Sequence, residues 1–309
     1  MAKSVLNAPH FQNEESAFAY VEAKLWPEGA VCPHCGNCDG SRIRKLAGQT
    51  TRIGLRKCNE CRKPFTVRMG TIFESSHLPL HLWLQVIHLM CASKKGISTR
   101  QIQRMLQCSM KTAWFLSHRI REAMREGDLS PFGQAGGAVE VDETYIGHKK
   151  GMGNPRGGHA HKMTVLGLVD RDSGKCRMFY VEKSAGSLIQ PIVLDNLSRE
   201  ARLMTDEHTM YRRIGREFAE HSSVMHYNKE YVRGDVTTNT VEGAFSIFKR
   251  GMKGIYQHCG EQHLHRYLAE FEFRYSHREK LGVNDAERAD RALRGVVGKR
   301  LTYGGFGAA

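Results

Sequence analysis

Hydrophobic side chains recur at helical spacing between residues 78 and 92. Leu82, Val86 and Met90 are each four positions apart, and Pro79 stands near the start of the segment. Apolar residues at this spacing line one face of an α-helix, and proline is favoured in its first turn. The pattern therefore predicts an amphipathic helix.

Two shorter helices are predicted between residues 98 and 124. Ser98 and Ser109 each precede a run with apolar residues at helical spacing, and serine is a strong helix N-cap. The break at Gln107 and Cys108 separates the two runs. The arrangement predicts a helix-turn-helix, with an ordinary helical hairpin as the alternative.

The pattern changes after a glycine-rich linker at residues 127–137. Alternating apolar and polar residues with many β-branched side chains now predict strands. Three adjacent strands, followed by strands that alternate with helices, indicate a mixed α/β sheet. The predicted strands are residues 137–146, 163–169, 177–181 and 203–205, and the predicted helices are 240–253 and 264–277.

Charge narrows the class of partner. The 309 residues include 46 Lys plus Arg and 32 Asp plus Glu, a net charge of +14, and the pI is about 9.5. This balance indicates a polyanionic partner, nucleic acid before a membrane. No apolar run reaches the roughly 18–20 residues that a bilayer requires, and the N-terminus lacks a signal-peptide core. We expect a soluble, cytoplasmic, nucleoid-associated protein.

Five of the nine cysteines lie close together near the N-terminus. Cys32 and Cys35 form one CxxC pair, and Cys58 and Cys61 form another, with 22 residues between the pairs. Two such knuckles complete the tetrahedral shell of a structural zinc ion, and the intervening segment can form the hairpin of a zinc ribbon. Reduced cysteines in loops are the alternative. Cys38 is expected to be a spare thiol, or a competitor of Cys35.

Basic residues dominate both N-terminal segments. Residues 41–68 contain nine basic residues and one acidic residue, and residues 94–125 contain eight and one. One-sided charge of this kind is typical of a surface that contacts DNA phosphates. In a helix-turn-helix, Lys111, Thr112 and Arg119 of the second helix would face DNA.

Three acids occupy positions where a mixed sheet would gather them. Asp142 lies within the first strand, Asp206 ends a later strand, and Glu242 lies in the first turn of the following helix. Converging carboxylates with hard oxygen ligands suit Mg²⁺ or Mn²⁺ ions, which activate a nucleophile and stabilise the leaving oxygen of a phosphodiester. Lys249, two helical turns beyond Glu242, could hold a DNA phosphate, and we expect Arg250 to contact DNA.

Each acid also has a structural interpretation. Asp206 could cap the next helix, and Asp142 could pair with a basic residue. Glu242 could form a capping box with Asn239, three residues earlier. The loop at residues 147–162 is similarly open: its Lys149 and Lys150 could clamp a DNA end, or the loop could be a tolerated surface feature.

The chain resembles bacterial insertion-sequence transposases of the DDE type, in the subgroup with an N-terminal zinc ribbon. The resemblance rests on CPHC and CNEC, GTIFESSHLPLHLW with SKKGISTRQIQRMLQCSMKTAWFLSHRIR, VEVDETYIG, TDEH, and RGDVTTNTVEGAFSIFKRGMKGIYQH. It implies an RNase H-like core that cuts transposon ends and joins them to target DNA with divalent metal. It also implies that Asp142, Asp206 and Glu242 are the catalytic acids and that Lys249 is the downstream basic residue. Asn239 is a rival of Glu242 or its helper, and Glu140, Glu143 and Asp170 have supporting roles.

The expected organisation follows from these patterns. A zinc ribbon with an N-terminal helix (residues 1–75) precedes a helical DNA-binding segment (76–127), an RNase H-like catalytic domain (137–280) and a C-terminal tail (281–309). The expected function is that of a DNA transposase acting at least as a homodimer on paired ends. A zinc-ribbon regulator with an inactive core and a structure-selective nuclease are the alternatives.

Overall fold

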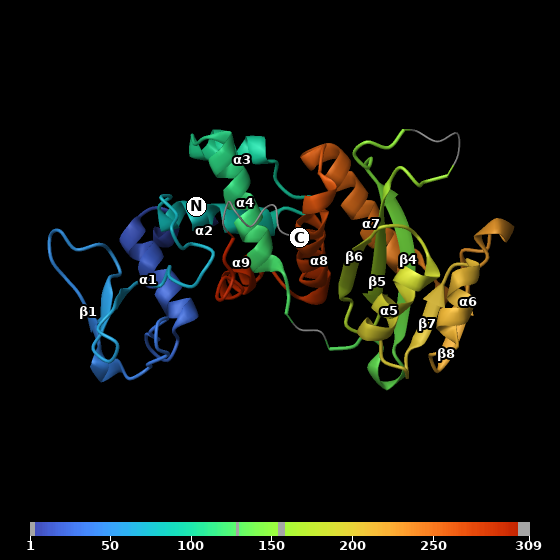
Figure 1. The fold of residues 1–309 in the computed structure, drawn as a ribbon, viewed down its shortest axis with the longest axis horizontal. Helices are drawn as coiled ribbons and strands as arrows, with labels where there is room; N and C mark the ends of the chain where they lie inside the picture. Colours follow the sequence, from blue (N-terminus) through green and yellow to red (C-terminus); the bar gives the residue numbers. More distant parts are fainter. Residues whose placement is uncertain (1–3, 128–129, 154–157, 302–309) are drawn as a thin grey trace. The chain divides into compact units, whose positions relative to one another are not determined.

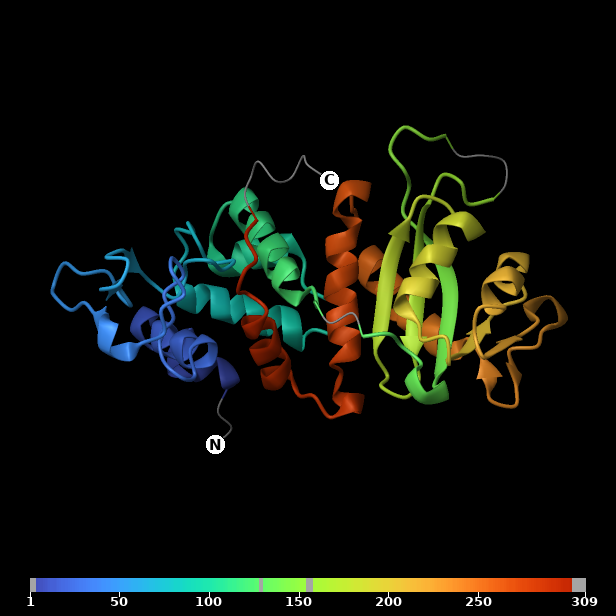
Figure 2. The same ribbon diagram turned by 60° about the horizontal axis from the view of Figure 1, so that its bottom comes forward.

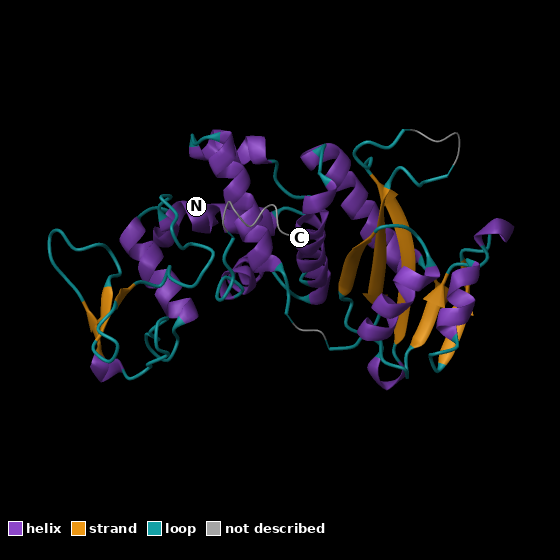
Figure 3. Cartoon of the chain, viewed as in Figure 1, coloured by secondary structure: helices purple, strands orange, loops and turns teal. Residues whose placement is uncertain are grey.

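The computed structural model describes residues 4–127, 130–153 and 158–301, and these separate into two compact units (Figure 1). One unit combines residues 1–93, 97–124 and 285–309, and the other combines residues 94–96 and 125–284. The first is mostly helical and the second contains the larger sheet (Figure 3). In the part of the chain that the structure describes, no helix is long and apolar enough to cross a membrane.

The first unit opens with α1 (Glu14–Leu25), whose N-terminus is capped by Asn13. A three-stranded antiparallel sheet follows, in the order β1 (Ile43–Lys45), β2 (Arg56–Cys58) and β3 (Pro64–Phe65). Its register pairs Ile43 with Cys58, so the hairpin begins and ends beside the cysteine knuckles. This is the predicted ribbon.

The expected helices of this unit are α2 (Leu80–Ala92), α3 (Thr99–Leu106) and α4 (Met110–Met124). The side chain of Ser98 accepts a hydrogen bond from the Gln101 N–H, and that of Ser109 accepts one from the Thr112 N–H at 3.0 Å. Both predicted caps are therefore confirmed. Gln107 ends α3 in the left-handed conformation at φ 48°, which turns the chain into α4.

The C-terminal segment differs from the expected tail. Residues 285–294 form α9 (Asp285–Arg294), which packs against α2. Arg288 is buried and donates to the carbonyl of Cys91 at 2.8 Å, while Ala292 and Leu293 are also buried. The segment thus completes the first unit, and the compact units divide the chain differently from the expected boundaries. The end of the expected tail, residues 302–309, lies outside the described residues.

The second unit contains a five-stranded sheet in the order β6-β5-β4-β7-β8. Neighbours among β4, β5 and β6 are antiparallel, whereas β7 is parallel to both β4 and β8. The strands are β4 (Ala138–Ile146), β5 (Met163–Asp170), β6 (Cys176–Val181), β7 (Arg202–Thr205) and β8 (Glu220–Ser223).

Helices cover both faces of this sheet (Figure 2). One hydrophobic core joins the sheet to α7 and α8, and a second joins the other face to α5 and α6. A short hairpin of β9 and β10 precedes α7, and a π-helical turn, Met252–Tyr256, follows it. The mixed α/β, RNase H-like architecture is therefore confirmed. The remaining elements are α5 (Gly186–Asn196), α6 (Thr209–Gly215), β9 (Val232–Arg233), β10 (Val236–Thr237), α7 (Asn239–Gly251) and α8 (Leu264–Ser276).

Candidate zinc centre and active site

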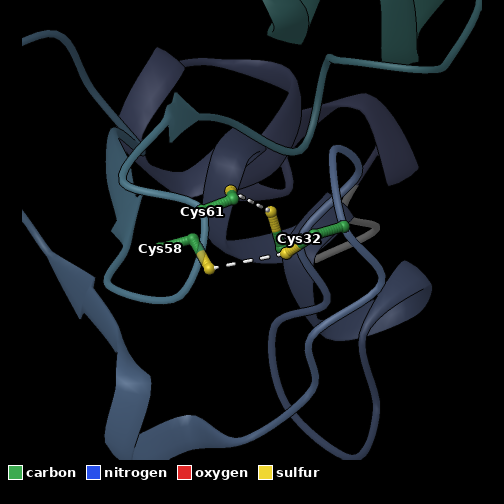
Figure 4. A group of neighbouring side chains, drawn as sticks. Cys32, Cys58 and Cys61 are labelled. Carbon is green, nitrogen blue, oxygen red and sulfur yellow. Dashed lines mark hydrogen bonds between the residues drawn. The ribbon is translucent and has the colours of Figure 1, made fainter.

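The two cysteine pairs meet beside the ribbon hairpin (Figure 4). The sulfurs of Cys32, Cys35, Cys58 and Cys61 all lie within 4.8 Å of one another. The Sγ–Sγ distances are 3.6 Å between Cys32 and Cys61 and 3.8 Å between Cys35 and Cys58. Four sulfurs at the Zn–S distance of about 2.3 Å in a tetrahedron would be about 3.8 Å apart. The arrangement fits a structural zinc ion.

The knuckle around Cys58 favours the thiolate that zinc requires. Backbone N–H groups of Cys61 and Glu60 face its sulfur and lower the pKa of Cys58 to about 6. Cys38 is exposed and stands outside the four-sulfur cluster, so it is the spare thiol rather than the competitor of Cys35. The predicted zinc ribbon is confirmed.

Strand register brings the first two acids together. Glu140 of β4 is paired in parallel with Met204 of β7. Two residues further along these two segments, Asp142 therefore lies beside Asp206. β7 ends at Thr205, whereas β4 continues to Ile146. Asp206 therefore lies at the end of its strand and next to the middle of β4. Its Oδ1 atom accepts the His208 N–H at 3.0 Å, which orders the turn into α6.

The third acid depends on how closely α7 approaches the sheet. Gly167 of β5 is paired with Asp142, and Phe245 and Val241 of α7 lie over it. A Cβ atom at position 167 would lie 2.6 Å from Phe245 and 3.0 Å from Val241. Because this position carries no side chain, α7 can carry Glu242 close enough for its charge to act on Asp142.

The charges of these carboxyl groups act on Asp142. Burial raises the pKa of Asp142 to about 7, opposed by a hydrogen bond from the Glu143 N–H. The charges of Glu143, Asp206 and Glu242 raise it further, with that of Glu143 contributing most. Burial also lowers the pKa of the Lys249 ammonium, and the charge of Asp142 opposes that shift. Asp142 and Lys249 thus lie close to each other and are both shielded from water.

This site opens into a pocket of about 740 Å³ with acidic and basic walls. Among the described residues, only the cysteines form a group of three or more metal-ligating side chains within 4.8 Å, so the carboxyl groups of Asp142, Asp206 and Glu242 do not all lie within that distance of one another. Three carboxylates that repel one another, with hard oxygen donors, fit a divalent ion. The lining residues are Asp142, Glu143, Thr144, Glu242, Phe245, Ser246, Lys249, Arg250, Lys253 and Gly254.

The geometry favours Glu242 over Asn239 as the third ligand. Glu242 lines the pocket, whereas Asn239 is the exposed first residue of α7 and is not among the lining residues. The alternative capping box of the two is absent from the contacts of this helix end. Thr238 is the N-cap residue, and its hydroxyl donates to Glu242 Oε1 at 2.9 Å.

Glu143 follows Asp142 in β4 and is also among the residues that line the pocket, while its carboxyl group lies near Tyr211 of α6. Burial raises its pKa to about 7, the charge of Asp206 contributes in the same direction, and the Ser184 hydroxyl donates to Glu143 Oε1 at 3.1 Å. The buried hydroxyl of Tyr211 points to the same carboxyl without a standard hydrogen bond. Sequence reasoning missed Tyr211, because nothing local distinguishes it from other tyrosines on apolar helix faces.

Glu140 connects β4 to the start of α7. Its fully buried carboxylate accepts the N–H groups of Thr240 and Val241 at 2.7 and 2.9 Å, together with the Thr240 hydroxyl. Arg171 pairs with it at 2.7 Å and also donates to the carbonyls of Asp235 and Thr237. The strand that carries Asp142 is therefore tied directly to the helix that carries Glu242.

We expect Glu140→Gln to loosen this connection. The amide presents a donor to N–H groups and leaves Arg171 without its charge partner, so the free energy of unfolding should fall by about 3 kcal/mol. Isothermal titration should also show weaker Mn²⁺ binding, because Glu242 is no longer held against Asp142. Glu270→Gln, which breaks the buried pair with Arg274 in α8, is the control for lost stability alone. Unchanged Mn²⁺ affinity in Glu140→Gln would contradict the positioning role.

Two residues expected to contact DNA are buried instead. Arg119 is 3% exposed, donates to the carbonyl of Glu74 at 2.6 Å and lies over the ring of Trp83. Lys149 is 9% exposed, and its ammonium donates to the carbonyl of Glu182. The expectation that these two side chains face DNA is therefore wrong. Of the others, Lys111, Lys150 and Arg250 are exposed, and Thr112 is partly exposed and hydrogen-bonded to Ser109.

Comparison with known proteins gives a consistent family. Residues 134–276 match the ISXO2-like transposase domain, and residues 12–64 match the transposase zinc-ribbon domain. The chain is 26% identical over 279 residues to an uncharacterised protein in transposable element ISH50 of Halobacterium salinarum, covering 85% of this chain and 91% of that protein. The chain belongs to the insertion-sequence transposases that carry an N-terminal zinc ribbon.

Proposed function

We propose that this transposase binds transposon ends, cuts a phosphodiester bond in a metal-dependent reaction and joins the freed end to target DNA. The observation that carries the proposal is that the charges of Asp206 and Glu242, from two other segments, act on Asp142, and that Asp142 and Glu242 line a pocket together with Lys249. Such a set suits a substrate with a phosphate at its reacting centre.

Each residue has a distinct task in this proposal. Asp142, Asp206 and Glu242 would hold divalent ions, Mg²⁺ or Mn²⁺, which when bound activate a hydroxyl nucleophile and stabilise the leaving oxygen. The charge of Asp142 acts on the Lys249 ammonium group, so the two side chains are close together. Lys249 would therefore hold a phosphate oxygen beside the acids. Arg250 and Lys253 line the same pocket and would extend that contact along the strand. Water would be the nucleophile in the cutting step, and the freed 3′-hydroxyl would be the nucleophile in the joining step at the same centre.

End binding is assigned to the first unit. The ribbon carries exposed Arg44, Lys45 and Lys57, and α4 presents Lys111 near its N-terminus. Contacts of this kind with phosphates fix the position of a protein on DNA and make its affinity fall with salt. Because a reaction on two ends needs two active centres, we propose a homodimer or larger assembly on paired ends.

The test is a reaction of the purified protein with its element's terminal DNA and a target plasmid. We expect cuts at the element boundary and joined products with Mg²⁺, and neither with EDTA. Cutting without joining would favour a structure-selective nuclease. Tight binding without cutting in either condition would favour a regulator with an inactive core, and would overturn the proposal.

A further inference from the structure

A segment between β8 and β10 presents large apolar side chains to solvent. In this segment, residues 225–233, which we name the aromatic arm, Tyr227 is 92% exposed and Tyr231 is 54% exposed. No other aromatic side chain in the described ranges is exposed to this degree. Met225 and Val232 of the arm are also exposed. Burial in the fold therefore does not account for these residues.

The arm is anchored beside the second catalytic acid. Glu207, which follows Asp206, accepts the backbone N–H groups of His226 and Tyr227 at 2.8 and 3.1 Å. These two bonds fix the backbone that carries Tyr227 to the end of β7. The exposed ring therefore stands on an ordered base rather than on a free loop.

The arm also reaches the third acid. The His226 Nε2 atom lies 3.7 Å from Glu242 Oε1 and 3.4 Å from the Thr238 hydroxyl. The His226 ring lies 5.2 Å from the ring of Tyr231, measured between centroids. The base of the arm is thus bonded to the residue after Asp206 and lies against Glu242 through His226, which places the arm at the edge of the acidic site.

The chemistry of the neighbouring site identifies what such rings would bind. A DNA strand at the acids brings nucleobases within reach of the arm, and stacking of a base on an aromatic ring is favourable for every base. Stacking needs an accessible base face, which a closed duplex hides, so the base must be unpaired. We propose that Tyr227 and Tyr231 stack on a base that is unpaired beside the scissile phosphate. This inference rests on the proposed function.

Charge in the arm agrees with a nucleic-acid occupant. Lys229, between the two tyrosines in sequence, and Arg233, two residues after Tyr231, are exposed, and Arg233 donates to the carbonyl of Ser223 at 2.8 Å. Glu230 is partly engaged by the Met225 N–H. Cations beside exposed rings suit a base together with its phosphate. A second copy of the chain would be the other class of occupant, and the test separates the two.

The experiment measures binding without chemistry. The full-length protein is titrated, in EDTA, into a DNA hairpin with one unpaired 2-aminopurine at a duplex junction, and into the same DNA with that base paired. We expect wild type to quench the unpaired base and to bind that DNA about tenfold more tightly, the size of one base–aromatic stack. Tyr227→Ala should remove the quenching and the preference, whereas Tyr227→Phe, which keeps the ring, should retain both. Leu188→Ala, at another exposed apolar residue of the same unit, is the control.

The outcomes distinguish the arm from the function as a whole. Equal behaviour of Tyr227→Ala and wild type would overturn the stacking proposal, while metal-dependent cutting could still stand. A change of mass in solution for Tyr227→Ala without any change in DNA binding would assign the arm to a second copy, and would also overturn it. Absence of binding to either DNA by wild type would overturn the stacking proposal, whereas the reaction with the element's terminal DNA tests the proposed function separately.

Discussion

Asp142→Asn should eliminate DNA cleavage and joining while leaving DNA binding intact. The amide keeps the shape of the side chain but removes the charge that a divalent ion requires, at the residue that stands between Asp206 and Glu242. Loss of one group that stabilises charge in a transition state costs a factor of about a thousand. Cleavage is measured with Mg²⁺, and binding is measured in EDTA by gel shift.

The same variant should be more stable than wild type without metal. Burial raises the pKa of Asp142 from 3.8 to about 7, so between these values the folded protein keeps a proton that the unfolded chain has lost. Stability therefore falls as the pH rises from about 4 to about 7 and stays lower above that range. The shift corresponds to at most about 4 kcal/mol, and partial exposure of the site reduces this to about 2 kcal/mol.

Thermal melting in EDTA at pH 4 and pH 8 checks this second readout. The variant should melt at a higher temperature than wild type at pH 8, and at nearly the same temperature at pH 4. Asp195→Asn, at an exposed position of α5, is the control and should change neither activity nor melting. Cleavage at the wild-type rate by Asp142→Asn would remove this residue from the active site.

Cys58→Ser should release zinc and unfold the ribbon. The buried core around the cluster consists of Cys32, Ile43, Cys58 and Phe65, which is too small to hold three short strands alone. Structural zinc contributes on the order of 10–16 kcal/mol in isolated zinc modules. We therefore expect zinc content to fall from one ion per chain to almost none, and limited proteolysis to cut between residues 30 and 70.

A matched control is present in the same knuckle. Cys38→Ser removes an exposed thiol that lies outside the cluster, so zinc content and protease resistance should match wild type. We also expect the five-stranded sheet to survive in Cys58→Ser, because it belongs to the other compact unit. Full zinc content in purified Cys58→Ser would contradict the assignment of the four ligands.

Features encoded by neighbouring residues could be predicted from the sequence. The CxxC pairs, the Ser98 and Ser109 caps and the alternation of β4 each depend on residues a few positions apart. Local geometry decides such elements, so the pattern is sufficient. The second CxxC pair needed only a hairpin to bring it to the first, and the basic segment between the pairs has the length for one.

Burial of charged residues could not be predicted in this way. Arg119 stands in a basic segment, but its guanidinium lies over the ring of Trp83, from a helix that begins 39 residues before it. Lys149 folds back onto the carbonyl of Glu182. The sequence of α9 is mostly polar, and only its packing on α2 shows that it is part of a core. Each of these depends on contacts between distant segments.

The candidate site was intermediate between these cases. Strand and helix positions predicted where Asp142, Asp206 and Glu242 lie in the chain, whereas their proximity came from the parallel register of β7 and the approach of α7. The bond of Glu140 to Thr240 spans 100 residues. The sequence shows only that Glu140 is a glutamate at an inward position of a strand, and it does not indicate that Thr240 is the residue bonded to it.

Because Gly167 has no side chain, α7 packs as closely against the sheet as the backbone of β5 allows. A single methyl group there would work as a wedge, lifting Phe245 and with it the acid one turn earlier on α7. The distance between Asp142 and Glu242, across which divalent ions would bind, therefore depends on the absence of a side chain at position 167 in the hydrophobic core, and not only on the two carboxylates. A copy of this element could lose its mobility through a change at Gly167 alone, with every acid of the site still in its sequence.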